Sequence, residues 1–413
     1  MVRHDEPGIA MTVGRLDRSY RALLAVPSVS RLLLGMQIAR IGQSMLSVTI
    51  VLFTLVSYHS AMLAGMATFF GIFPGLLVSP IAGALLDRHG RTRLVVLDYL
   101  VALGSLTLIG VLALTSALPA WLMIVIAAVA SFTAPLSGTG LRSLFPLIVP
   151  NHLWERVNAI DSTGYVIATV IGPPLAAGLV ALWGGAVAFI AIGISFGFAA
   201  IVIARVPDPP APTALAGPLL VNAWEGLIYT WRNPTLRGLG FSISVLNLAT
   251  GTFNIVVPLI VLERFHLDEK MVGMVFAVQG LAGIVSAFVF GRKDSRDRER
   301  MMLAVPMAGM GIAAAMLLLR SNLVALVIVM GITGLLNGPL DIALFTLRQR
   351  RTDPDWTGRA FAVSMSFNAL GIPVGAALAG VLAARSIESA IAFSVVTCLI
   401  SAVLAAVMIP SSE

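Results

Sequence analysis

Apolar residues follow one another along this chain in long blocks, and short polar segments separate the blocks. A helix needs about 20 predominantly apolar residues to cross the roughly 30 Å hydrocarbon core of a bilayer. Twelve blocks reach that length, so the pattern predicts an all-α membrane protein that crosses the bilayer twelve times. The predicted spans are residues 31–57, 61–86, 94–115, 119–141, 161–181, 184–204, 236–262, 270–291, 300–319, 323–347, 360–383 and 388–409.

Composition supports this class of protein. Apolar residues make up 58% of the chain and charged residues 11%, and the mean hydropathy is +0.94, which is outside the range of soluble domains. The formal charge of +7 comes from basic residues in short loops, where they act as topology signals. We therefore expect the lipid bilayer, and no nucleic acid, as a partner. Known catalytic and phosphate-binding motifs, His and Cys at metal-ligand spacing, and a second cysteine for a disulfide are lacking, so we expect no enzyme activity, no cofactor and no metal.

The loops also predict an orientation. Residues 1–30 hold no secretory signal and form a charged tail, and most basic residues fall in loops on the same side as that tail. Both termini are predicted to be cytoplasmic. Lys270 and Lys293 are the only lysines, a bias towards arginine that fits a GC-rich bacterial genome and hence a multi-pass protein of the bacterial inner membrane.

The middle of the chain divides it into two parts. Residues 206–212 hold four prolines, and residues 219–232 then place their apolar side chains on one helical face. An amphipathic helix on the cytoplasmic surface is one interpretation, and a flexible linker is the other. A shift of 203 residues aligns Arg156 and Gly172 with Arg359 and Gly375, which favours a duplicated six-helix unit. The predicted organisation is a tail (1–30), a six-helix bundle (31–204), a linker (205–235) and a second six-helix bundle (236–409).

A charged turn between the second and third spans carries the sharpest motif. It has the pattern Gly-x-Leu-x-Asp-Arg-x-Gly-Arg-x-Arg, with Gly83, Asp87, Arg88, Gly90, Arg91 and Arg93 as its candidate functional residues. Gly83 allows close packing, Gly90 permits a tight turn, and the arginines can anchor at an anionic leaflet. With twelve spans, this loop resembles the signature loop of the major facilitator superfamily, whose members are built from two pseudo-symmetric six-helix bundles.

Weaker motifs resemble the branch of that superfamily that includes macrolide and enterobactin exporters. They are residues 146–159 before the fifth span, Asp98 in the third, and residues 223–227 in the linker. Gly172, Pro173 and Gly178 resemble the glycine-proline motif of drug antiporters. The resemblance implies that Asp87 latches the cytoplasmic side against the start of the eleventh span, near Ala360. Alternatively, Asp87 and its neighbouring arginines only specify topology.

Polar residues inside the spans are candidates for a substrate path. Gln37, Arg40, Ser44 and Ser47 share one face of the first span, Asn247, Thr250 and Asn254 lie on the seventh, and Asn337 lies on the tenth. The resemblance implies that these three helices line a central cavity. The alternative, for the serines and threonines above all, is hydrogen bonding between packed helices.

Charges inside the spans are candidates for coupling, because a lone charge there needs a partner or an aqueous cavity. Arg40 and Asp341 could approach each other across the two halves, or each could be satisfied within its own half. Asp98, Asp161 and Asp341 are the candidate proton-carrying groups. Residues 121–133 of the fourth span hold no charge, which departs from the arginine that drug antiporters of this superfamily often carry there.

The resemblance therefore implies a monomeric secondary active transporter that works by alternating access. Proton-coupled efflux of an amphipathic small molecule or drug is the predicted activity. Export of a specific metabolite, siderophore or lysolipid is an alternative, and a transporter-like membrane sensor is an alternative of another class.

Overall fold

A computed structural model describes residues 17, 19–208, 219–290, 298–319, 322–353 and 356–410, and in this part of the chain every regular element is a helix. Eleven helical segments are long and apolar enough to cross a membrane. One of them, Arg156–Ile203, has 48 residues, about twice the length that one crossing needs. The predicted fold class, an all-α protein of twelve crossings, is confirmed. The N-terminal tail lies almost wholly outside the described residues, as do residues 209–218 of the linker.

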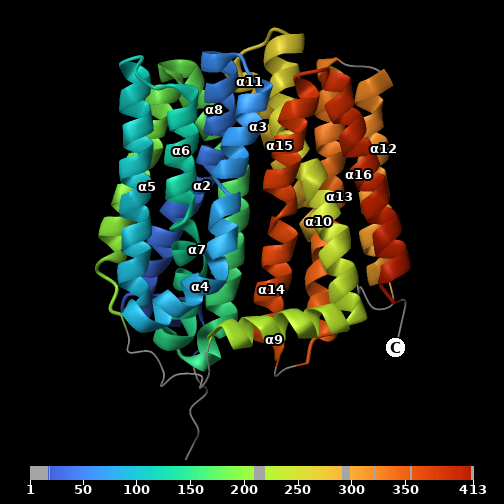
Figure 1. The fold of residues 1–413 in the computed structure, drawn as a ribbon. Helices are drawn as coiled ribbons and strands as arrows, with labels where there is room; N and C mark the ends of the chain where they lie inside the picture. The colour runs from blue at the N-terminus through green and yellow to red at the C-terminus, as the bar shows by residue number, and fades with distance from the viewer. Residues whose placement is uncertain are drawn as a thin grey trace, which may run out of the picture.

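The helices of the first half of the chain lie together on the left of Figure 1. They are α1 (Tyr20–Ala25), α2 (Val29–Tyr58), α3 (Ala61–Phe70), α4 (Phe73–His89), α5 (Arg91–Leu114), α6 (Ala120–Ser131), α7 (Ala134–Ile148), the short 3-10 turn Asn151–Leu153 and α8 (Trp154–Ile203). Gly184 interrupts α8 with a φ of +81°, a backbone conformation that side chains disfavour. Arg156 near the start of α8 contacts Tyr20, and Asp208 after its end contacts Arg91, so the chain reverses at Gly184 and α8 makes two crossings.

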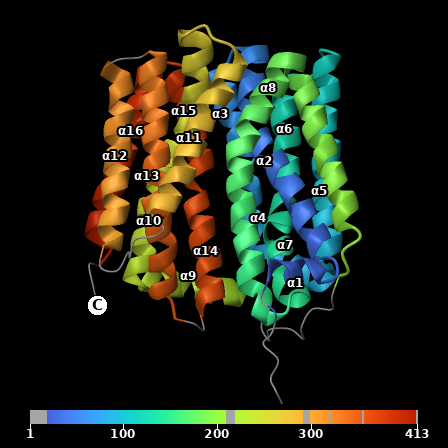
Figure 2. The same ribbon diagram turned by 180° about the vertical axis from the view of Figure 1, so that it is seen from behind.

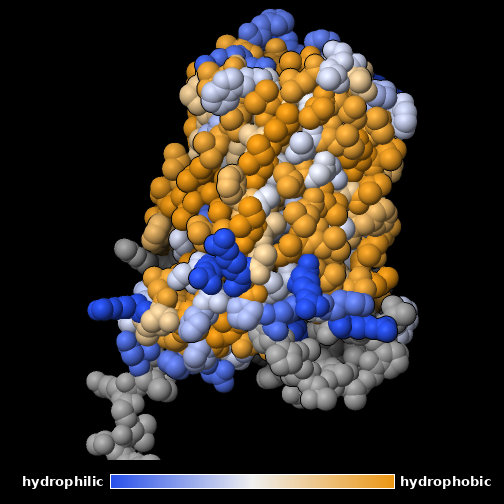
Figure 3. Space-filling model, turned by 90° about the vertical axis from the view of Figure 1, so that its left-hand side faces the viewer, coloured by the Kyte–Doolittle hydropathy of each residue, from blue (hydrophilic) through white to orange (hydrophobic). Residues whose placement is uncertain are grey.

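The second half repeats this arrangement. It comprises α10 (Pro234–Leu259) with a π-helical end (Ile260–Arg264), α11 (Glu269–Phe290), α12 (Glu299–Leu319), α13 (Leu323–Arg350), α14 (Thr357–Ala369), α15 (Gly371–Ala383) and α16 (Ile387–Met408). Figure 2 shows both groups of helices from behind, with the second group on the left. The surface in Figure 3 carries a broad apolar belt, with hydrophilic residues gathered at its two ends.

Three predicted spans are broken helices. The second is α3 followed by α4, the fourth is α6 followed by α7, and the eleventh is α14 followed by α15. Pro74 and Pro135 stand in the first turns of α4 and α7. The backbone N–H groups of a first turn have no partner within the helix, so a proline there costs no hydrogen bond. The fourth span also continues to Ile148, beyond its predicted end at Leu141, so Arg142 lies inside the helix and not in a loop.

The linker helix α9 (Leu219–Arg232) runs across one end of the molecule (Figure 1). Trp224, Leu227 and Trp231 are exposed on it, whereas Thr230 is buried. The Tyr229 ring stacks on Trp356 at a centroid distance of 4.9 Å, and the Tyr229 hydroxyl accepts a hydrogen bond from the Asp353 N–H. The second half of the chain thus holds α9 firmly, with its apolar side chains turned outwards.

The two halves meet at the end of the molecule opposite α9. There α3 packs against α15, and residues 170–177 of α8 pack against α11. A Cβ added to Gly273 of α11 would lie 2.7 Å from the Ala177 Cβ and 3.0 Å from the Pro174 Cα. At the α9 end, by contrast, α4 and α14 hardly touch, and they are drawn well apart in Figure 1. The conformation is closed at one end and splayed at the end that carries α9.

Candidate functional site

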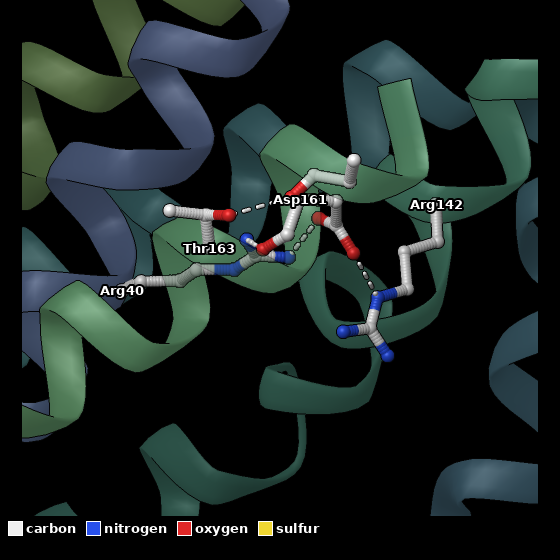
Figure 4. Close-up of polar contacts among 5 residues, drawn as sticks. Arg40, Arg142, Asp161 and Thr163 are labelled. Atoms are coloured by element: carbon white, nitrogen blue, oxygen red, sulfur yellow. Dashed lines mark hydrogen bonds and ion pairs between the residues drawn. The ribbon is translucent and has the colours of Figure 1, made fainter. Parts of the chain in front are cut away.

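Three charged residues from three helices converge in the first half of the chain. Arg40 comes from α2, Arg142 from α7 and Asp161 from α8 (Figure 4). Arg40 and Asp161 are largely buried between α2 and α8, whereas Arg142 reaches them from a partly exposed position on α7. Asp161 was predicted as a coupling group and Arg40 as a cavity residue, and the structure places them in one cluster with Arg142.

Asp161 accepts bonds from both arginines. The Arg40 Nη1 donates to the Asp161 carbonyl oxygen at 2.8 Å, and its Nη2 donates to Asp161 Oδ1. The Arg142 Nε donates to Asp161 Oδ2 at 3.2 Å. The side chains of Asp161 and Arg40 are 8% and 19% exposed, whereas that of Arg142 is 53% exposed. Asp161 therefore carries one buried pair and one pair that solvent reaches.

Arg40 was expected either to approach Asp341 across the two halves or to find a partner within its own half, and this cluster shows the second arrangement for the observed conformation. Arg40 is satisfied within its own half by Asp161, and the structure does not bring it to Asp341. Sequence reasoning missed Arg142 because the charge was read as the end of a span. The three-residue cluster had no spacing signal, since its members come from helices far apart in sequence.

Asp341 lies alone on α13. Its side chain is exposed, and no hydrogen bond or ion pair joins it to another residue of the described chain. Arg348, seven residues on and thus on the same face, is fully buried, and its Nη1 contacts the Met365 sulfur of α14 at 2.8 Å. Asp341 therefore points along the side of α13 that faces α14, and it does not pair with Arg348.

The polar stripe of α2 packs closely on α8. A Cβ on Gly164 would lie 2.3 Å from Gln37 Oε1, and one on Gly172 would lie 2.4 Å from Ser44 Oγ. Ser47, one turn beyond Ser44, is exposed. Of the glycine-proline motif on α8, Gly172 meets Ser44 and the Pro173 carbonyl lies near Gly273, whereas nothing lies within 4 Å of a Cβ on Gly178. Gln37 and Ser44 thus join helices within one half.

The cavity residues predicted in the second half also divide into those that join helices and those that are exposed or half-buried. The Asn247 side-chain amide donates to the Asn368 carbonyl at 2.8 Å, which ties α10 to α14. Thr250 is exposed, and Asn254 and Asn337 are half-buried. Asp98, on α5, is buried next to Thr133 and Ser137. The exposed Thr250 and Asp341 are thus open to contact from outside their helices.

The charged turn is held by a residue that sequence reasoning did not single out. The Arg91 N–H donates to Asp208 Oδ1 at 3.0 Å, and a Cβ on Gly90, whose φ is +93°, would lie 2.2 Å from Asp208 Oδ2. Arg88 and Arg93 are exposed. The surroundings of Gly83 and the side chain of Asp87 lie outside what the structure describes. Asp208 was hidden within the proline-rich segment, where nothing in the pattern linked it to a turn 117 residues earlier.

A comparison with models of known protein families supports what the twelve crossings and the charged turn indicate. A family model described as Major Facilitator Superfamily matches residues 32–245 and again residues 239–413. The chain belongs to the Major Facilitator Superfamily. A relative named "Uncharacterized MFS-type transporter y4rN", from Sinorhizobium fredii, is 34% identical over 93% of this chain and 96% of its own.

Other relatives of this transporter are named for efflux. Macrolide efflux protein A of Streptococcus pyogenes is 23% identical over 85% of this chain and 88% of its own length. Multidrug efflux pump Tap of Mycolicibacterium fortuitum is 27% identical over 81% and 85% of the two chains. Among solved structures, the nucleoside transporter NupG superposes with a TM-score of 0.70 at 10% identity, over 92% of this chain and 96% of that one. A bacterial homologue of the iron transporter ferroportin, in an inward-facing state, gives the same TM-score at 16% identity, over 91% and 97% of the two chains. The structural likeness at this identity concerns the fold alone.

Proposed function

We propose that this superfamily member exports amphipathic small molecules or drugs by alternating access, in exchange for protons. One observation carries the proposal: the two halves are closed at one end and splayed at the end that carries α9. The exposed carboxylate of Asp341, on α13 of the second half, supports it. Relatives named for macrolide and multidrug efflux support the choice of cargo. The low charge of the spans supports the same class of cargo, because a path with few charges suits amphiphiles better than polyanions.

The splayed end is proposed to face the cytoplasm. Basic loops and the amphipathic α9 lie at this end, as the positive-inside rule requires of a cytoplasmic face. Both termini would then be cytoplasmic in a bacterial inner membrane. On this assignment, residues 31–204 and 236–409 are the two rocking bundles, and residues 205–235 are the linker between them.

Asp341 is the proposed coupling group. A carboxylate inside a span must face water, a cation or a proton, because an isolated charge in hydrocarbon is costly. Asp161 already neutralises two arginines, and Asp98 is buried beside two hydroxyl groups. Asp341 has neither kind of partner in the described chain, so it is the group most free to exchange a proton or contact a cationic cargo. Asp87 is the proposed latch, acting on α14 when the splayed end closes.

Transport by purified protein in sealed proteoliposomes tests the proposal. A pH-sensitive dye inside the vesicles and erythromycin or ethidium as cargo would report proton and cargo movement together. We expect cargo to accumulate under an imposed proton gradient and each addition of cargo to move protons. Binding of cargo without flux would point to the sensor and overturn the proposal.

Two variants separate the coupling group from the fold. Asp341→Asn should abolish proton-driven accumulation but leave the thermal midpoint unchanged, because the side chain is exposed. Glu388→Gln is the matched control, since Glu388 is 53% exposed and pairs with Arg264 at the closed end. Full proton-driven accumulation by Asp341→Asn would remove Asp341 from the mechanism.

A further inference from the structure

A pocket of about 380 Å³ opens between α1, α2 and the first half of α8. Its walls include Tyr20 from α1, Leu33 and Gln37 from α2, and Ile160, Thr163 and Ile167 from α8, with Arg40 and Asp161 at its base. This volume is within the roughly 300–1,000 Å³ range of small-molecule sites. All its lining residues come from the first half of the chain, whereas transporters of this architecture hold their cargo between the halves.

The pocket opens on the side of α8 that faces lipid. Thr163, Ile167, Ile171 and Leu175 follow one another at four-residue spacing, and Ile167, Ile171 and Leu175 are 41%, 43% and 46% exposed. The exposed polar residues Asn158, Ser162 and Thr169 lie on another face of the helix, whereas Thr163 stands at the pocket end of the stripe. In Figure 2, α1, α2 and the first half of α8, in bright green, are seen at the surface, with α1 beneath the other two. An apolar exposed stripe at this position lies against the bilayer.

The rim of the pocket is basic and aromatic. The guanidinium carbon of Arg156 lies over the Tyr20 ring, 5.4 Å from its centroid. Tyr20 and Leu24 are about half exposed on one face of α1, an arrangement typical of anchors at a membrane interface. From Arg156 to Ile167 the helix rises about 16 Å, so the cationic rim and the apolar wall lie at different depths of the same leaflet.

We propose that this pocket is a binding site for an anionic phospholipid of the leaflet at the α9 end. The phosphate would lie at the rim, against Arg156 and the Tyr20 hydroxyl. One acyl chain would lie along Leu33, Ile160 and Ile167. Basic pockets between membrane helices on the cytoplasmic side bind anionic headgroups in this way. The site does not depend on the proposed efflux activity.

The occupant is a resident lipid and not cargo, because the pocket opens sideways into the bilayer and is walled by one half only. Its position nevertheless brings it close to the charged cluster of Arg40 and Asp161. Arg40 at its base holds Asp161, so a bound lipid would pack against the two helices that the buried ion pair joins.

Native mass spectrometry of the purified protein tests the site. The probes are phosphatidylglycerol and phosphatidylcholine with identical acyl chains. Wild type should retain phosphatidylglycerol at collision energies that strip phosphatidylcholine. Thr163→Trp, which fills the pocket, should bring phosphatidylglycerol retention down to the phosphatidylcholine level. Leu175→Trp places the same indole on the same helix outside the pocket and should leave retention unchanged.

Charge is tested separately. Arg156→Gln should weaken phosphatidylglycerol binding about fivefold, the effect expected of one basic residue at an anionic headgroup. Arg232→Gln, on α9 at the same end of the molecule, is the matched control and should have no effect. Equal retention of the two lipids by wild type, or full retention by Thr163→Trp, would overturn the proposal. Displacement of bound phosphatidylglycerol by erythromycin would assign the pocket to cargo instead.

Discussion

Gly65 of α3 and Gly380 of α15 lie backbone to backbone where the two halves meet. A Cβ added to Gly65 would lie 2.4 Å from the Ala376 carbonyl oxygen and 3.1 Å from the Gly380 Cα. A Cβ added to Gly380 would lie 2.7 Å from the Ala61 carbonyl oxygen. Backbone atoms cannot rotate away as a side chain can, so the closed end depends on the absence of side chains at these two positions.

Gly65→Ala should therefore favour the conformation that is open at this end. Overpacking a tight contact costs about 1–3 kcal/mol, which shifts a two-state balance at least about fivefold. Spin labels at the exposed residues Arg88 and Gln349, at the α9 end, should move closer together, and the transport rate should fall. Gly178→Ala is the control, because nothing lies within 4 Å of a Cβ there. Label distances and transport unchanged by Gly65→Ala would show that the contact does not govern the closed state.

Asp161→Asn should destabilise the protein more than Arg142→Gln does. The first change leaves the buried Arg40 guanidinium without its counter-charge, and breaking such a buried pair costs about 3–5 kcal/mol. Arg142 is 53% exposed, so its loss should cost at most about 1 kcal/mol. Thermal unfolding in detergent measures both effects.

The double variant Arg40→Gln with Asp161→Asn tests whether charge is the cause. It should be more stable than Asp161→Asn alone, because the charge that then lacks the Asp161 carboxylate is Arg142, whose side chain is 53% exposed and reaches solvent. A double variant that loses as much stability as the two single changes added together would instead point to lost packing.

This cluster also marks where sequence reasoning reaches its limit. Hydropathy predicted twelve crossings because each span must bury about 20 apolar residues whatever its neighbours are. It also placed an amphipathic segment at residues 219–232, where the structure has α9. The partner of Arg40 depends on how α2 and α8 are rotated about their axes, and a hydropathy pattern does not contain that rotation. The end of the fourth span was misplaced for a related reason: Arg142 is tolerated inside the helix because Asp161 of another helix meets it.

Asp208→Ala should loosen the charged turn. The Asp208 carboxylate accepts a hydrogen bond from the Arg91 N–H, the first backbone amide of α5. That amide has no partner within the helix, and a negative charge is favourable at a helix N-terminus. Hydrogen exchange at the Arg91 amide should accelerate. Asp268→Ala is the matched control, because Asp268 accepts from the Met271 N–H at the start of α11. That change should accelerate exchange at Met271 and not at Arg91. Unchanged exchange at Arg91 in Asp208→Ala would contradict the assigned role.

Tyr229→Ala should release α9 from the second half of the chain, whereas Tyr229→Phe should release it only slightly. Phenylalanine keeps the parallel stack on Trp356 but loses the hydroxyl that the Asp353 N–H contacts. A stacked aromatic pair contributes about 0.5–1.5 kcal/mol beyond its buried area. Hydrogen exchange over residues 224–232 measures the docking. Equal acceleration in the two variants would show that the hydroxyl, and not the ring, holds the helix.

Asp87→Asn should impair transport and leave membrane insertion intact. The proposed latch places a negative charge at the N-terminus of α14, which begins at Thr357, and an asparagine cannot supply that charge. In the splayed conformation α4 and α14 hardly touch, so the change should act on the closed state and slow the return of the empty transporter. Single-turnover efflux and steady-state exchange in proteoliposomes separate these steps: the first should change little and the second should slow. Asp87→Glu, which keeps the charge, should recover part of the rate. Normal turnover in Asp87→Asn would leave this turn as an orientation signal, with its arginines alone meeting the positive-inside rule.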